Sequence, residues 1–155
     1  MGIQIGSLNV RRNILIDALP ARVWSEFANY QKMKAWFGQG HTLETYEPGL
    51  GGKVELSIVD KGETKVFGGK ILVFEAAGEL TFENNWFTDD AWPVATYITI
   101  RLGSLYSGTL VELYHHGFER LGAAASETLV GYENGWGANH LTSLRNIVLK
   151  GKSQK

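Results

Sequence analysis

The sequence predicts a single α+β domain in which a curved, seven-stranded antiparallel sheet, two short helices and a long C-terminal helix enclose an apolar cavity. Three observations support this fold class. Short β-rich runs separated by glycine, proline or charged turns occupy most of the chain, as in an antiparallel meander. Two short segments with helical periodicity follow the first run, and the longest helical pattern comes last. A chain of 155 residues can bury a substantial core without a second domain.

Composition narrows the class of protein further. Charged residues make up 20% of the chain, hydrophobic residues 44%, and the formal net charge is -1. These values give no general attraction to nucleic acid or anionic lipid, so we expect neither as a partner. The absence of cysteine excludes disulfides and thiolate metal sites. No signal-like segment opens the chain and no apolar run could span a bilayer, so we expect a soluble, cytoplasmic protein.

The first strand is expected at residues 7–16 and is followed by two short helices. Asp17 is a possible cap for the first helix, and Pro20 near its first turn is the stronger start signal. The second helix should follow Asn29. Apolar residues at helical spacing mark the two helices: Val23, Trp24 and Phe27 in the first, and Met33, Trp36 and Phe37 in the second.

Six further strands are expected at 42–47, 52–59, 64–75, 79–85, 94–102 and 109–118. The glycine pairs 51–52 and 68–69, together with Gly108, fit turns or points of sheet curvature. They do not form a phosphate-binding loop, because none opens a helix directly after a strand. We find no nucleotide-binding motif and no nucleophile elbow.

The longest helix is expected at 126–150, with Ser126 as its cap and Gly151 as its stop, followed by a polar tail from about residue 152. One broad face of this helix is apolar, as expected for a helix laid across a sheet. Its members are Leu129, Val130, Gly137, Leu141, Leu144, Ile147 and Val148. Glu133 and His140 fall near the middle of the same face, and Trp136 lies at its edge.

The alternation of side chains along strands predicts the lining of the cavity. The expected inward apolar residues are Phe67, Ile71, Val73, Phe82, Ile98, Ile100, Val111 and Leu113. The polar groups facing inward would be His115, Glu133 and His140, with Asn84 as a possible fourth. A buried carboxylate needs a partner, so these groups form a satisfied internal network or line the pocket mouth, orient a ligand, or act as an acid and base.

Metal binding is not expected. His115 and His116 are neighbours on a strand and therefore point to opposite faces, so they cannot chelate one ion together. Among the tryptophans, Trp24 should pack in the core, and Trp86 and Trp92 should be partly exposed beside a turn.

Local motifs add a resemblance that covers almost the whole chain. They are the segment Ile16-Asp17-Ala18-Leu19-Pro20-Ala21-Arg22-Val23-Trp24, then Trp36-Phe37-Gly38, then Gly108-Thr109 leading into Leu113-Tyr114-His115-His116-Gly117-Phe118, and finally Gly135-Trp136. In this order they resemble the homologues of the heat-shock-protein-90 ATPase activator, within the START-like (SRPBCC, Bet v1-like) superfamily. The resemblance implies a helix-grip fold with a pocket. Together with helical geometry, it places Trp36, Phe37 and Trp136 near the pocket entrance.

The chain departs from the family pattern at three places. Ala76-Ala77 stands where a double proline is common, a tryptophan usual near Asn84 is missing, and His140 replaces an apolar residue. A relative's ligand is therefore not carried over to this chain.

Three functions follow from the pocket and the resemblance. The first is binding of a small apolar or aromatic molecule in the cavity, without a cofactor. The second is a co-chaperone-like interaction module that contacts a chaperone partner through an exposed surface. The third is an enzyme of the cyclase or hydrolase kind that uses His115, Glu133 and His140.

Overall fold

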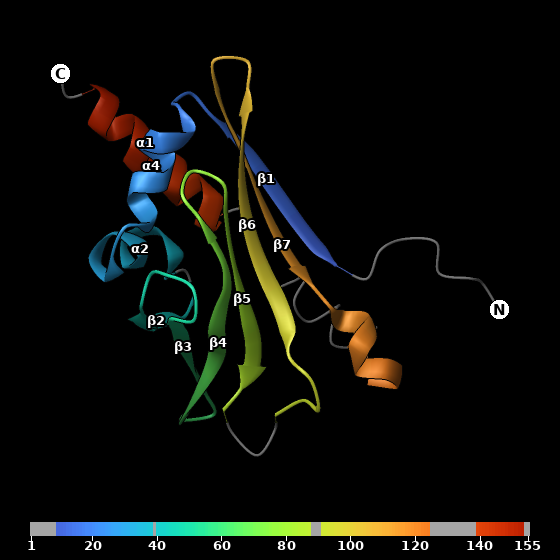
Figure 1. The fold of residues 1–155 in the computed structure, drawn as a ribbon. Coiled ribbons are helices and arrows are strands. Elements are labelled where there is room, and N and C mark those ends of the chain that lie inside the picture. The colour runs from blue at the N-terminus through green and yellow to red at the C-terminus, as the bar shows by residue number, and fades with distance from the viewer. Residues whose placement is uncertain (1–8, 39, 88–90, 125–138, 154–155) are drawn as a thin grey trace.

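A computed structural model describes residues 9–38, 40–87, 91–124 and 139–153. Its strands form one antiparallel sheet of seven strands in the order β1-β7-β6-β5-β4-β3-β2. Figure 1 shows the helices α1, α2 and α4 gathered on one side of this curved sheet. The α+β helix-grip class expected from the sequence is therefore confirmed. No helix in the described ranges combines the length and the apolar character needed to cross a membrane.

The strands lie close to the expected ranges. Their bounds are β1 Val10–Ile16, β2 Thr42–Tyr46, β3 Lys53–Asp60, β4 Glu63–Glu75, β5 Glu79–Trp86, β6 Thr96–Leu105 and β7 Gly108–His116. The main difference is at β6, which continues through the residues expected to form a turn. Leu105 pairs with Gly108, so the hairpin turns on Tyr106 and Ser107 alone. Gly103 remains within the strand because glycine permits a turn without requiring one.

The two short helices follow β1 as expected. The first, α1, is Pro20–Trp24, continued by the 3-10 turn η1 at Ser25–Phe27, and the second, α2, is Tyr30–Phe37. Leu19 is the N-cap residue of α1, so Asp17 does not cap this helix, and Pro20 in the first turn fixes its start. The side chain of Asn29 caps α2 by accepting a 2.9 Å hydrogen bond from the Lys32 N–H.

A β-bulge in β4 changes which side chains face the core. Ile71 pairs with Phe82, whereas Val73 pairs with Thr81 and Phe74 with Leu80. The extra residue shifts the alternation by one, so Phe74 packs against the core where strict alternation placed Val73. The expectation that Val73 faces inward was therefore wrong, because sequence alternation carries no sign of a bulge.

The C-terminal helix α4 is described over Asn139–Ser153. It continues past Gly151, so the expected stop at that glycine was wrong. Its buried residues Leu141, Leu144 and Val148 confirm the expected apolar face. The rest of the expected helix, 126–138, including Ser126, Glu133 and Trp136, lies outside the described residues. The remaining short element is the 3-10 segment η2, Phe118–Ala124.

Cross-strand pairing builds the core on the face that the helices cover. One row of direct partners runs across the sheet through Ile71, Phe82, Ile98, His115 and Val10. All of these side chains are almost fully buried. The pairing thus brings a histidine into an otherwise aliphatic and aromatic row.

Candidate functional site

His115 of this row and two further polar residues lie together on the inner face of β5, β6 and β7. Asn84, Thr96 and His115 are 1%, 0% and 0% exposed. Thr96 Oγ1 lies 2.8 Å from His115 Nε2 and donates its proton to the backbone carbonyl of Asn84 at 3.1 Å. The Thr96 hydroxyl therefore bridges the His115 imidazole and the Asn84 backbone carbonyl.

His115 is uncharged at neutral pH. Burial lowers the pKa of His115 from 6.5 to about 3, and the neighbouring His116 adds a smaller effect in the same direction. The inner cluster is therefore polar but neutral. His115 also packs against the ring of Phe118, with centroids 4.6 Å apart.

The side chain of Asn84 differs from its polar neighbours. Neither its Nδ2 nor its Oδ1 forms a hydrogen bond, and both atoms are inaccessible to solvent. Leaving such a group unsatisfied costs roughly 1–3 kcal/mol relative to a hydrogen-bonded one. Asn84 is thus an uncompensated polar group within the described core, and it offers both a donor and an acceptor.

Aromatic residues lie on either side of Asn84 along the inner face of β5. Along β5, Phe82 and Trp86 flank Asn84 on the same face. Starting at Phe82 and ending at Trp86, successive ring contacts run through α2, α4, the connection before β2, and β4, and both end rings belong to β5. The contacts are Phe82–Phe37 at 6.2 Å, Phe37–His140 at 5.6 Å, His140–His41 at 5.4 Å, His41–Phe67 at 5.9 Å and Phe67–Trp86 at 5.0 Å. We call these six rings the aromatic circuit.

Two histidines belong to this circuit, and the sequence singled out only one of them. His140 is 2% exposed and packs between Phe37 and His41. Burial lowers the pKa of His41, against a weaker opposing effect from a backbone hydrogen bond at Phe37. His41 precedes β2 in a glycine-flanked connection, where periodicity gives no signal. Its position directly after the Trp36-Phe37-Gly38 motif was the available clue.

Two hollows at the rim of the sheet reach this circuit. One, of about 390 Å³, is lined by His41, Gly38 and the β3 residues Ile58 and Val59. The other, of about 350 Å³, is lined by Trp86 and the same two β3 residues. Ile58 and Val59 are 37% and 69% exposed. Two exposed apolar residues therefore lie at the rim beside two rings of the circuit, together with the polar residues Thr42, Ser57, Asp60 and Lys65.

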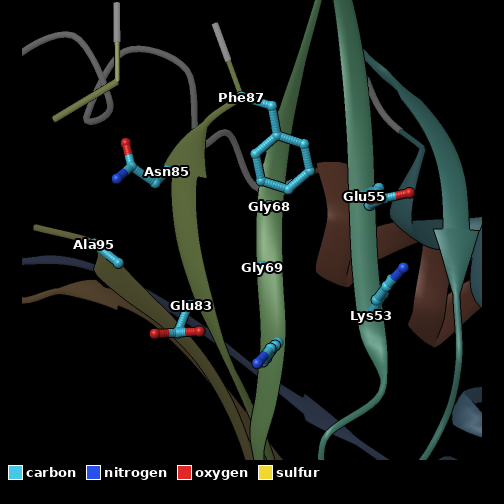
Figure 2. A pocket seen from close by; sticks show the side chains of 9 residues that line it. Lys53, Glu55, Gly68, Gly69, Glu83, Asn85, Phe87 and Ala95 are labelled. Carbon is cyan, nitrogen blue, oxygen red and sulfur yellow. The ribbon is translucent and has the colours of Figure 1, made fainter.

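A separate hollow lies on the opposite, outer face of β3, β4 and β5. Figure 2 shows it, with Gly68 and Gly69 on β4, Lys53 and Glu55 on β3, and the ring of Phe87 directed across the strands. A Cβ at Gly68 would lie 2.0 Å from the Val54 carbonyl oxygen, and its φ is +133°. Close strand packing therefore requires glycine here, which agrees with the expected role in sheet curvature.

The outer face also carries a hydrogen-bonded chain of polar side chains. His116 Nε2 lies 2.8 Å from Thr99 Oγ1, which lies 2.8 Å from Thr81 Oγ1, and Thr81 donates to Glu79 at 2.7 Å. His115 and His116 therefore point to opposite faces, as expected. Within the described residues, no three His, Asp or Glu side chains come together in a way that could hold a metal ion.

The structure assembles most of the residues singled out by the sequence. Those on the strands share the inner face, namely Phe67, Ile71, Phe82, Ile98, Ile100, Val111, Leu113 and His115. Trp36 is fully buried between Phe27 and Phe37, and its Nε1–H donates to the Glu26 carbonyl at 3.2 Å. Trp36 therefore packs against Phe37 within the core. Trp24 stacks on Phe27 in the core, and Trp86 and Trp92 are half-buried, as expected.

Comparison with solved structures identifies the same fold in bacterial proteins. A solution structure from Arthrobacter aurescens superposes with a TM-score of 0.70 at 20% identity, covering 96% of this chain and 90% of the other. The Aha1 dimer from Colwellia psychrerythraea gives 0.59 at 16% identity, covering 90% and 95%. DynU16, from a dynemicin biosynthetic locus, gives 0.64 at 14% identity, covering 94% and 49%. No curated protein matches the sequence.

A curved antiparallel sheet gripped by a C-terminal helix defines the START-like class. The family model described as "Activator of Hsp90 ATPase homolog 1-like protein" matches residues 17–148. The chain belongs to this family.

Proposed function

We propose that this protein binds a small apolar or aromatic molecule in a cavity between the inner face of the sheet and the C-terminal helix. The buried, unsatisfied amide of Asn84 carries the proposal. A folded protein rarely keeps such a group without a functional reason, because satisfying it or replacing it with an apolar residue would increase stability. A ligand that pairs with this amide supplies the reason.

The proposed binding residues combine apolar walls with a few polar groups, as is usual for small-molecule sites. They are Trp36, Phe67, Ile71, Phe82, Ile98, Ile100, Val111, Leu113, His115, Glu133, Trp136 and His140. We add Phe37 and Asn84, which the sequence analysis also placed at the pocket, and His41 and Trp86, which the ring contacts bring to it. Trp36 contributes indirectly, because its ring packs against the ring of Phe37. Glu133 and Trp136 are included on the sequence argument alone.

The rim hollows beside His41 and Trp86 support a route of entry. Exposed apolar residues at a rim, such as Val59, favour the passage of an apolar molecule over a polar one. The route ends at rings that a planar molecule can contact by stacking or edge-to-face packing.

A catalytic role for His115 has less support. A general base works best with a pKa near the operating pH, and the pKa of His115 is about 3. At neutral pH this imidazole is a weak base and serves as a fixed hydrogen-bonding group.

A co-chaperone role is the second candidate, and the family description supports it. It predicts binding of the middle domain of Hsp90 at an exposed surface. Inner-face substitutions that leave the fold intact would then have no effect on the interaction.

An NMR titration of ¹⁵N-labelled protein tests the proposal, with a panel of flavonoids, sterols, fatty acids and polyketide-like aromatics. We expect saturable shifts at Asn84, Thr96, Ile98 and His115. The inner-face variant Ile98→Phe should weaken binding by overfilling the site, while the outer-face variant Phe87→Ala should leave it unchanged. A cooperative thermal unfolding transition in each variant would verify that both variants fold. Shifts confined to the outer face, or none from any probe, would overturn the proposal.

A further inference from the structure

We infer that the ligand is an uncharged planar molecule whose edge carries an N–H donor beside a carbonyl acceptor, as in a lactam, and that this edge pairs with the Asn84 amide. The inference rests on the proposed function and specifies the ligand class. It uses only described residues, namely Asn84, its polar neighbours and the aromatic circuit.

The neighbouring asparagine shows what a satisfied amide looks like in this strand. Asn85 Oδ1 accepts from the Trp86 N–H at 2.8 Å and from the Trp92 N–H at 2.9 Å, and its Nδ2 donates to the Trp92 carbonyl at 3.1 Å. Asn85 thus links the end of β5 to Trp92. Asn84 faces the opposite side and has neither kind of bond.

The two open positions of Asn84 define a complementary ligand edge. Its Nδ2 is a donor and its Oδ1 an acceptor, held in one plane. A lactam presents its carbonyl and N–H in one plane at the matching spacing, so both bonds form together. Exchanging the amide oxygen and nitrogen would leave the argument intact, since a lactam can turn over to match either assignment.

The surrounding rings favour a flat ligand. Asn84 lies between Phe82 and Trp86 along β5, and the circuit continues through Phe37, His140, His41 and Phe67. Aromatic walls contact the faces and edges of a planar ring system more fully than those of a flexible chain. The Asn84 amide, held beside these rings, then fixes the orientation of the bound molecule.

The described cluster favours an uncharged ligand. Asn84, Thr96 and His115 carry no charge at neutral pH, and Glu133, which is included on the sequence argument, lies outside the described residues. Burial keeps His115 neutral and lowers the pKa of His41. A buried charge without an opposite charge is costly, so a neutral molecule is bound in preference.

Calorimetric titration with three matched probes tests the inference. The probes are 2-quinolone, its N-methyl derivative, which lacks the donor, and naphthalene, which lacks both polar groups. We expect the protein to bind 2-quinolone at least about tenfold more tightly than N-methyl-2-quinolone, since a buried hydrogen bond contributes about that factor. The Asn84 side-chain amide signals should shift with 2-quinolone and not with naphthalene.

The variant Asn84→Leu separates pairing from steric effects. In this variant the preference for 2-quinolone should fall below about twofold, while naphthalene binds as well as before. A preference that persists in Asn84→Leu is steric and overturns the inference. Equal binding of all three probes by the unmodified protein overturns the lactam inference and leaves the apolar pocket standing. Binding of none of them overturns the lactam inference, and the proposed function is then decided by the wider panel of the NMR titration. If the leucine variant does not fold, the side-chain amide signals of Asn84 in the unmodified protein test the inference. A shift with 2-quinolone and not with naphthalene supports it, and no shift with 2-quinolone overturns it.

Discussion

Thr96 and His115 are joined by a hydrogen bond of 2.8 Å on adjacent strands, at the polar end of an otherwise apolar sheet face. Thr96 also donates to the Asn84 backbone, so the three residues are fixed relative to one another. The bond satisfies one nitrogen of a buried neutral imidazole. A rigid, uncharged and partly unsatisfied cluster of this kind suits recognition of a neutral ligand.

The buried histidine predicts a loss of stability in acid. Its pKa is about 3 in the folded state and about 6.5 when unfolded, so the unfolded state binds more protons between these values. The stability that the neutral His115 contributes is fully present above pH 6.5 and is lost as the pH falls towards 3. We expect about 3 kcal/mol less stability from this group at pH 4.5 than at pH 7. Urea unfolding at both pH values measures the difference.

The variant His115→Gln is the control for this effect, because His41 and His116 also have lowered pKa values and shift stability in the same direction. Glutamine keeps a polar group at the position and does not titrate. The loss between pH 7 and 4.5 should be smaller in the variant by about 3 kcal/mol. Equal losses in the two proteins would show that His115 is not buried in its neutral form.

Replacing Asn84 by leucine should stabilise the free protein. The substitution removes a buried amide without a hydrogen-bond partner and introduces a side chain of similar size. A gain of about 1–2 kcal/mol in the free energy of unfolding is expected. Asn85→Leu is the matched control, and it should destabilise the protein because it breaks three hydrogen bonds. A destabilised Asn84→Leu variant would contradict the assignment of Asn84 as unsatisfied.

Two strand glycines should respond differently to alanine. At Gly68 a Cβ would overlap the Val54 carbonyl, and φ is positive, so Gly68→Ala should cost at least about 2 kcal/mol. At Gly103 a Cβ would meet no atom within 4 Å, so Gly103→Ala should be neutral or stabilising by less than about 1 kcal/mol. Chemical denaturation distinguishes them, and similar costs at both sites would be inconsistent with the described strand packing.

A buried tyrosine links the sheet to the helical layer. The hydroxyl of Tyr46 donates to the Phe27 carbonyl at 2.7 Å, and the residue is 5% exposed. Tyr46→Phe should therefore cost about 1–2 kcal/mol. Tyr106 at the β6–β7 turn is 91% exposed, and Tyr106→Phe should have no measurable effect on thermal unfolding. An unaffected Tyr46→Phe variant would show that this bond does not anchor the η1 turn.

Periodicity predicted the parts of the fold that depend on local pattern. Alternation in β6 and β7 placed Ile98, Val111 and His115 on the inner face, and the structure confirms this. The β4 bulge escaped prediction because it depends on how Phe74 meets Leu80 across the sheet. The continuation of α4 past Gly151 was not predicted, because glycine in a helix has only a modest free-energy cost and need not end it.

The residues of the candidate site were predicted only where they follow a periodic pattern. His140 lies on an apolar helix face, and that pattern is visible in the sequence. His41 lies in a connection without periodicity, and only tertiary packing brings its ring to 5.4 Å from His140. The unsatisfied state of Asn84 is likewise a property of its surroundings, and residue identity cannot reveal it.

Intermolecular nuclear Overhauser effects test most directly whether an apolar ligand site lies on the inner face of the sheet. With naphthalene bound, we expect contacts from its protons to the methyl groups of Ile98, Ile100 and Leu113. Contacts to the outer-face methyl groups of Leu15 and Leu110 instead, or the absence of any contact at saturating naphthalene, would contradict it.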